Sequence, residues 1–375
     1  MSLLAPYNNQ DLPDGVVSRF IEGVNGLRMH ILEAGDHGSM HPTVMLLHGF
    51  PELAYSWRKV MPALAGAGYH VIAPDQRGYG RTTGWSNDYN TDISSFRMIN
   101  LVRDILCLLD MLEHPYVEAI IGHDFGAHVA AYASLIRPDI FRAMVLMSAP
   151  FPGAPNRRIE AKDPIHKELA NLSRPRKHYQ WYYSTAEANQ DMHRCPQGVD
   201  RFLRGYFHQK SADWTGNTPF ALTAWTAEQL AQLPTYYIMD LNEDMAATVA
   251  KEMPTAGHVK ANEWLPEREL IIYAKEYERT GFQGGLNWYR CRTGGTYHQE
   301  LDMFFGSAIK VPSYFIAGES DWGVYQIPDA LEKMQTIACQ DFRGLHLVPN
   351  AGHWVQQEQP NAVINHLLTF FDGLR

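Results

Sequence analysis

Asp124 stands in a segment whose residue types would suit a nucleophile. The segment GHDFGA, residues 122–127, has a glycine two positions to either side of Asp124 and lies between a predicted strand and a predicted helix. Glycines at these places are needed where a turn is so sharp that side chains would meet neighbouring backbone. A carboxylate there would project beyond a sheet at the N-terminus of a helix, which keeps it ionised. Taken alone, the segment is equally typical of a helix N-cap, for which Asp is preferred.

One histidine is placed to act as a base for this carboxylate. Among 17 histidines, His353 in NAGHW, residues 350–354, follows the last predicted strand and a glycine. Asp321 in GESDWG ends the preceding predicted strand and would orient the imidazole and stabilise its cation. The chain order nucleophile, acid, histidine is that of one known kind of catalytic triad. Glu319 is the alternative acid, but we favour Asp321 because strand ends carry the functional groups of open parallel sheets.

Two backbone amides could stabilise an oxyanion beside Asp124. The segment HGFPE, residues 48–52, follows the third predicted strand. Catalytic sites with a nucleophile on such a turn place one oxyanion-hole donor in the loop after that strand. The N–H groups of Phe50 and Phe125 are the candidates, and two donors are what a tetrahedral intermediate requires. A simple loop with a proline turn is the other interpretation of HGFPE.

The elements that position these residues alternate between strand and helix. An antiparallel pair is expected at 17–34, around the turn Asn25-Gly26. Apolar runs predict strands at 43–49, 69–75, 117–124, 141–150, 311–321 and 344–354. Apolar residues at helical spacing predict helices at 55–68, 94–112, 126–138 and 362–374. This alternation predicts a mostly parallel α/β sheet with helices on both faces. Residues 1–150 and 299–375 form the two parts of this core, and 151–298 form a long, mainly helical lid with helical patterns at 236–253 and 267–280.

Composition limits the kinds of partner. The chain has 375 residues, 45% hydrophobic and 19% charged, with a formal net charge of -9. A negative charge disfavours nucleic acid and anionic lipid. The four cysteines are widely spaced, which favours a reducing compartment, and neither a signal peptide nor a membrane-spanning apolar run is apparent. We therefore expect a cytoplasmic protein that binds a small molecule, and a homodimer is one possible assembly.

Together, GHDFGA, HGFPE, GESDWG and AGHW resemble the epoxide hydrolases of the α/β-hydrolase fold, from about residue 17 onward. The segment GFQGGLNWYR, residues 281–290, is similar to the part of the family's lid that carries a catalytic tyrosine, here Tyr289. A second lid tyrosine matches Tyr179 in HYQWYY, with Tyr182 and Tyr183 as close competitors. The insertion is longer than a typical family lid, so the resemblance does not name the substrate.

The resemblance implies a mechanism in two steps. Asp124 attacks an epoxide carbon while Tyr179 and Tyr289 bind the ring oxygen, and His353 then activates a water that hydrolyses the resulting ester. Phenols suit this reaction because ring opening creates an alkoxide on the side opposite the nucleophile. The expected partners are a small apolar epoxide and water, without cofactor or metal, in a pocket formed by Phe50, Pro51, Phe125, Trp181 and Trp354.

Two other functions remain open at this point. Dehalogenases use the same aspartate nucleophile, although haloalkane dehalogenases commonly follow it with Trp and fluoroacetate dehalogenases with Arg, where this chain has Phe125. A non-catalytic ligand-binding protein of the same fold is the other alternative, but such a protein need not keep nucleophile, acid and base together.

Overall fold

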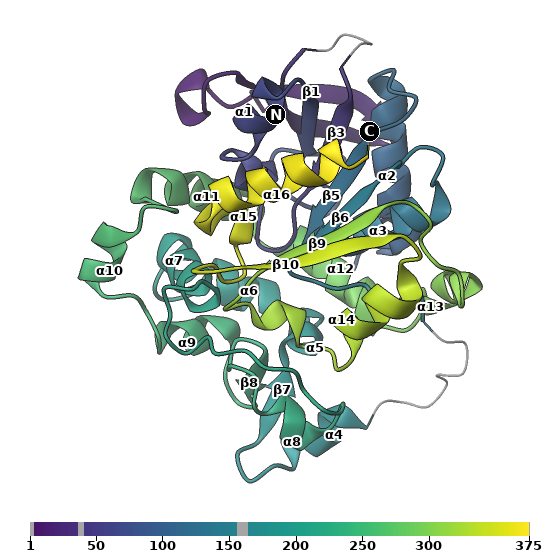
Figure 1. The fold of residues 1–375 in the computed structure, drawn as a ribbon. Coiled ribbons are helices and arrows are strands. Elements are labelled where there is room, and N and C mark those ends of the chain that lie inside the picture. The colour runs from purple at the N-terminus through teal and green to yellow at the C-terminus, as the bar shows by residue number, and fades with distance from the viewer. Residues whose placement is uncertain (1–3, 37–40, 156–163, 375) are drawn as a thin grey trace.

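The structure is a computed structural model that describes residues 4–36, 41–155 and 164–374. Eight strands form one sheet in the order β1-β2-β4-β3-β5-β6-β9-β10, and Figure 1 shows helices on both of its faces. The pairs β1–β2 and β2–β4 are antiparallel, and the other neighbours are parallel. The predicted mostly parallel sheet is therefore confirmed.

The first two strands form the predicted antiparallel pair. β1 (Val16–Val24) and β2 (Leu27–Ala34) are joined by Asn25 and Gly26, whose φ angles are 48° and 81°. Two successive residues with positive φ are what a tight hairpin turn requires, and Asn-Gly adopts them at low cost.

The central strands are buried on both faces. Every residue of β3 (Thr43–Leu47), β4 (His70–Pro74), β5 (Ala119–His123) and β6 (Met144–Met147) is buried, which explains their continuous apolar sequences. β9 (Ser313–Gly318) lies beside β6, and β10 (Phe342–Val348) forms the edge. The parallel strands run in one direction, so the loops after β3, β5, β6 and β9 meet at one end of the sheet.

Helices cover the two faces of this sheet. α2 (Met98–Met111) and α3 (Phe125–Ile136) pack together, with α3 against β5 and β6, whereas α1 (Met61–Gly66) packs on β4 and contacts α16 (Pro360–Asp372). The helix predicted at 55–68 is divided into the 3-10 helix η2 (Ala54–Trp57) and α1. Pro62 lies in the first turn of α1, where its missing N–H is tolerated. The shorter elements of the core are η1 (Asn9–Asp11), η3 (Ser94–Phe96), η4 (Asp302–Phe304), η5 (Trp322–Val324), α14 (Ala330–Lys333), the π-helical turn η6 (Met334–Ala338) and α15 (Val355–Glu358).

The inserted segment lies between β6 and β9 and is mainly helical, as predicted. Figure 1 shows its teal and green elements gathered at one end of the sheet. Its elements are α4 (Ile165–Ala170), β7 (Arg176–His178), α5 (Tyr179–Tyr183), α6 (Ala188–His193), α7 (Val199–Lys210), α8 (Ala227–Leu230), β8 (Ile238–Asp240), α9 (Met245–Ala250), α10 (Ala256–Ala261), α11 (Glu267–Thr280), α12 (Gln283–Thr293) and α13 (His298–Leu301). The limits 151 and 298 that the sequence suggests for the lid stay a prediction.

Part of one helical prediction in the lid is wrong. The pattern at 236–253 predicts a helix, but its first part forms β8, which pairs antiparallel with β7 before α9 begins. The partner strand lies some sixty residues earlier, so a short sequence window contains no sign of the pairing. Within the described ranges, no helix is both long and apolar enough to cross a membrane.

Candidate active site

Asp124 lies on the sharp turn between β5 and α3. Its backbone has φ 53° and ψ −118°, a conformation rare for a residue with a side chain. The two flanking glycines are required by close backbone contacts: a Cβ on Gly122 would lie 2.2 Å from the carbonyl oxygen of Gly126, and a Cβ on Gly126 would lie 2.4 Å from that of Leu47. The Asp124 side chain makes no capping hydrogen bond to α3, so it does not play the N-cap role that the sequence left open.

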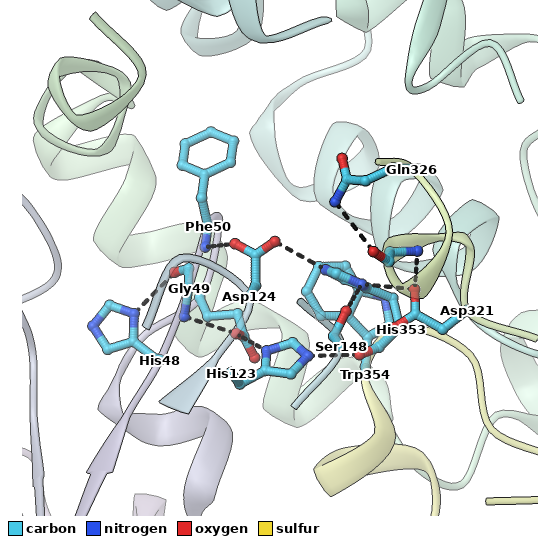
Figure 2. Close-up of polar contacts among 12 residues, drawn as sticks. His48, Gly49, Phe50, His123, Asp124, Ser148, Asp321, Gln326, His353 and Trp354 are labelled. Atoms are coloured by element: carbon cyan, nitrogen blue, oxygen red, sulfur yellow. Dashed lines mark hydrogen bonds and ion pairs between the residues drawn. The ribbon is translucent and has the colours of Figure 1, made fainter. Parts of the chain in front are cut away.

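The Asp124 carboxylate is held between an amide and an imidazole. The Phe50 amide donates to Oδ1 over 3.0 Å, and Nε2 of His353 lies 3.4 Å from Oδ2 (Figure 2). Burial alone would raise the pKa of Asp124, but the hydrogen bond and charge of His353, together with the charges of Lys210 and His123, lower the pKa well below its usual range. The carboxylate is therefore ionised and has one oxygen fixed by the Phe50 amide.

The second expected oxyanion donor is differently placed. Phe125 is the first residue of α3, and within the described chain its amide makes no hydrogen bond to the Asp124 carboxylate. Gly49 leaves space beside the carboxylate, since a Cβ there would lie 2.4 Å from Oδ1 of Asp124. The loop after β3 can thus approach the nucleophile only because position 49 lacks a side chain.

His353 is oriented by two groups on its other ring nitrogen. Nδ1 lies 3.1 Å from Oδ1 of Asp321 and 2.7 Å from Oγ of Ser148, and Figure 2 shows both on the side away from Asp124. Burial would raise the pKa of Asp321, but the charge and hydrogen bond of His353 lower it. Asp321 is only 1% exposed, whereas Glu319 is exposed. The structure thus brings Asp321, and not Glu319, to the histidine.

Ser148 is a site residue that sequence reasoning missed. It directly follows β6, and its φ of 68° turns its hydroxyl toward His353. Its position directly after a strand, at the end of the sheet where Asp124 lies, was the available signal, but many loop serines have such a position.

A buried acid–base pair joins the loop after β3, the end of β5 and the loop after β10. Glu52 Oε2 accepts a hydrogen bond from the Gly49 amide at 2.9 Å and lies 2.5 Å from Nδ1 of His123. Nε2 of His123 donates to the carbonyl oxygen of His353 over 2.6 Å. Burial would lower the pKa of His123, but the Glu52 carboxylate raises it, so the ring is stabilised as a cation with both nitrogens donating. The pair thus fixes the loop that carries Phe50 relative to His353.

A cavity beyond Asp124 is enclosed by core and lid residues. Its lining consists of Asp124, Phe125, His128, Ala149, Pro150, Tyr179, Gln180, Tyr289, Arg292, Gly323, Gln326, Ile327 and Ala330. Both expected phenols are among them. Burial raises the pKa of both phenols, and the charge of Asp124 adds to the effect. They therefore stay protonated and can donate hydrogen bonds.

The competing tyrosines of α5 are engaged elsewhere. The Tyr182 hydroxyl donates to Asp191 over 2.8 Å, and the Tyr183 hydroxyl donates to that of Tyr206 over 3.2 Å. The Tyr179 hydroxyl accepts a hydrogen bond from the side-chain Nε2 of Gln180 at 3.1 Å and donates to Oε1 of Gln326 over 3.3 Å. Of the three tyrosines, the structure brings only Tyr179 to the cavity lining.

The expected pocket residues are only partly brought together. Phe125 lines the cavity, and the Phe50 ring lies edge-on against that of Tyr289 at 5.5 Å. Pro51 is buried after a cis peptide bond, and Trp354 packs behind His353 with the ring centroids 4.6 Å apart. Trp181 lies apart from this lining, with its ring 4.0 Å from that of His166. The reason is helical geometry, because residues two positions apart on a helix, such as Tyr179 and Trp181, point to different sides.

No group of three or more His, Cys, Asp or Glu side chains in the described ranges could hold a metal ion. Among the described residues that line the cavity, Asp124 carries a carboxylate and Arg292 a permanent positive charge.

The fold, with Asp124, His353 and Asp321 brought together at one end of the sheet, is that of an α/β hydrolase. Residues 42–360 match the family described as alpha/beta hydrolase fold. Epoxide hydrolase B of Mycobacterium tuberculosis is 32% identical over 93% of this chain and 97% of its own length, and epoxide hydrolase A of the same organism is 33% identical over 96% and 99%.

Solved structures give the same result. An epoxide hydrolase from an endophytic Streptomyces superposes with a TM-score of 0.77 at 31% identity, over 97% of both chains. Epoxide hydrolase I of potato, Solanum tuberosum, has a TM-score of 0.72 at 28% identity, over 96% of this chain and 99% of its own. The chain belongs to the epoxide hydrolase family of the α/β-hydrolase fold, and the predicted fold class is confirmed.

Proposed function

We propose that this enzyme hydrolyses an epoxide to a vicinal diol through a covalent ester on Asp124. One observation carries the proposal: the ionised Asp124 carboxylate, with Oδ1 bound by the Phe50 amide, faces the same cavity as the two lid phenols of Tyr179 and Tyr289. The names of the relatives support the substrate class.

In the first step, Oδ2 of Asp124 attacks a ring carbon and the bond from that carbon to the ring oxygen breaks. The ring oxygen takes a proton from a phenol of Tyr289 or Tyr179, so a hydroxyalkyl ester and a phenolate form. Protonated phenols in a buried cavity serve this step because they stabilise charge that develops only as the ring opens.

In the second step, Nε2 of His353 removes a proton from water and the hydroxide attacks the ester carbon of Asp124. The Phe50 amide, already 3.0 Å from Oδ1, stabilises the oxyanion. Asp321 and Ser148 at Nδ1 hold the ring while it carries the proton. The acyl–oxygen bond, between the ester carbon of Asp124 and the alkoxy oxygen, then breaks, and the leaving oxygen takes the proton of the added hydroxyl, so the diol and the Asp124 carboxylate form. The imidazolium proton restores the phenol through the solvent.

Single turnover in heavy-oxygen water tests this mechanism. The incoming oxygen goes to the ester carbon, so the first diol should be unlabelled and the label should appear in the peptide that contains Asp124. Direct incorporation of label into the first diol would exclude the covalent ester. The variant Asp124→Ala should form neither ester nor diol, while an unaltered circular dichroism spectrum would verify that it is folded.

A further inference from the structure

A buried lysine of the lid lies against the loop that carries His353. Lys210 is the last residue of α7 and is only 3% exposed. Its backbone carbonyl accepts a hydrogen bond from the amide of His353 over 2.7 Å, and a Cβ on Gly352 would lie 2.5 Å from the same oxygen. The end of α7 is therefore in direct contact with this loop.

Aromatic rings surround the ammonium group of Lys210. Nζ lies 5.3, 5.8, 4.8 and 5.6 Å from the ring centroids of Tyr206, Tyr236, Tyr237 and Trp354. Such ring faces attract a cation. In the parts of the chain that the structure describes, no acidic side chain forms an ion pair with Nζ. The rings thus hold the positive charge in place without neutralising it.

Two of these rings connect the ammonium group to the candidate active site. The Trp354 ring packs against that of His353 with the centroids 4.6 Å apart, and the Tyr237 ring packs against that of Tyr179 at 5.1 Å. Lys210 and His353 therefore contact the same indole ring. Inside a protein the dielectric constant is lower than in water, so a charge in this position acts on the imidazole without touching it.

Buried carboxylates of the core act on the charge of Lys210. Burial lowers the pKa of Lys210, and the charges of Asp124, Asp321 and Glu52 oppose this lowering. In return, the charge of Lys210 helps to lower the pKa of Asp124. Glu52 has its own cation in His123, 2.5 Å away. The charge of Lys210 therefore remains for Asp124 and Asp321.

The second step of the proposed reaction requires an unprotonated imidazole beside a buried carboxylate. Once Asp124 is an ester, Asp321 still carries its charge 3.1 Å from Nδ1 of His353. A negative charge at that distance favours the imidazolium form, and within the described ranges Oδ2 of Asp321 has no hydrogen-bond partner that would weaken this effect. Because an imidazolium cannot remove a proton from water, the site needs an opposing positive charge.

We propose that Lys210 is a positioning residue of the second step, whose positive charge keeps His353 unprotonated while Asp124 is an ester. Lys210 acts through the imidazole and does not touch the substrate. This proposal rests on the proposed function and adds a residue to the same site.

Other charged or titratable groups face His353 and Lys210 from the core and the lid. They are Asp124, Asp321, Glu52, His123, Glu358, Tyr206, Tyr236 and Tyr237. Burial raises the pKa of the three tyrosines, so they stay neutral. Burial also raises the pKa of Glu358 to about 8, but its titration is common to the wild type and to every variant of Lys210. Of the whole group, His123 and Lys210 add positive charge, and Glu52 balances that of His123.

Single turnover of styrene oxide at several pH values tests the proposal, because it measures the two steps separately. The appearance of ester on the peptide that contains Asp124 reports ring opening, and its disappearance reports ester hydrolysis. In Lys210→Met the pH at which hydrolysis is half-maximal should rise by at least about one unit. Below the wild-type midpoint, hydrolysis should then be about tenfold slower, because the unprotonated fraction of the imidazole falls by that factor. At high pH the rate should recover, and ring opening should be no slower than in the wild type.

Two further variants separate charge from packing. Lys210→Arg keeps the charge and should keep most of the wild-type pH profile. Lys210→Gln removes the charge but leaves a polar side chain, and repeats the test if circular dichroism shows that Lys210→Met is not folded.

Lys177→Met is the matched control. Nζ of Lys177 also lies over a lid tyrosine, 4.8 Å from the ring centroid of Tyr182, and the substitution removes the same charge. The charges that act on Lys177 are those of Asp244, Asp191 and Glu243. Its pH profile should equal that of the wild type.

An unchanged pH profile in a folded variant without the Lys210 charge would overturn the proposal. An equal slowing of both steps at every pH would also do so, and would assign Lys210 to packing alone. Failure of the proposed function is a different result, since the wild type would then form no ester on Asp124 at any pH.

Discussion

Replacing Glu358 by Ala should destabilise the loop that carries His353, the proposed base. Glu358, in α15, accepts hydrogen bonds from the amides of Ala212, Gly352 and Trp354 at 2.8, 2.9 and 3.0 Å. Two of these amides flank His353 in sequence, and the third belongs to the lid. One side chain thus satisfies donors from the base loop and from the inserted segment.

The magnitude follows from the burial of those donors. Gly352 and Trp354 are buried, so their amides cannot turn to water, whereas Ala212 is half-buried and can. A buried donor without a partner costs about 1–3 kcal/mol, so Glu358→Ala should lose about 2–6 kcal/mol. That is a large part of the roughly 5–15 kcal/mol that stabilises a typical protein. In Glu358→Gln the remaining side-chain oxygen can still accept from the amides of Ala212 and Gly352, which share one oxygen of Glu358, while the Trp354 amide loses its acceptor. The free energy of unfolding should therefore fall by about 1–3 kcal/mol.

Equilibrium unfolding in urea, followed by tryptophan fluorescence, measures these losses as shifts in midpoint at constant slope. Glu278→Ala is the control: Glu278 is exposed on α11, and its substitution should change the free energy of unfolding by less than about 0.5 kcal/mol. The reasoning would be refuted if Glu358→Ala unfolded within the error of that control, or if the Gln variant were less stable than the Ala variant.

Three further predictions concern the site. Tyr289→Phe should slow ester formation in rapid-mixing experiments by about tenfold or more, because a donor to the ring oxygen is lost, whereas Tyr182→Phe, outside the cavity lining, should not; equal rates would remove Tyr289 from the mechanism. Gly126→Ala would place a Cβ 2.4 Å from a backbone oxygen at the end of β3, and should cost about 1–3 kcal/mol of stability together with most activity; normal stability in thermal unfolding would contradict this close approach. In the pair Glu52–His123 the carboxyl pKa is lowered from 4.5 and the imidazole pKa is raised from 6.5, so the pair contributes its full stability between pH 4.5 and 6.5. This contribution is lost as the pH falls through the lowered pKa of Glu52, or as it rises through the raised pKa of His123. The stability advantage of the wild type over Glu52→Gln should therefore narrow at both pH extremes, and a difference independent of pH would contradict the pair.

Local sequence patterns predicted most of the sheet. Strands such as β3, β5 and β6 are continuous apolar runs because both of their faces are buried, and the turn at Asn25-Gly26 needs positive φ angles that few other pairs adopt. These signals lie within a few residues of the element that they specify. The prediction failed at β8, where the partner strand decides the structure and lies far away in the sequence.

The sequence by itself determined the fold class, and it predicted Asp124, His353 and Asp321 as nucleophile, base and acid, because glycines, strand ends and chain order are local or sequential features. Only the tertiary structure decided which side chains meet. Ser148 reaches His353 across 205 positions, Tyr179 and not Tyr182 or Tyr183 lines the cavity, and Trp181 faces away from it. Contacts of this kind depend on how a lid packs against a sheet, and packing is a property of surfaces that no single stretch of sequence contains.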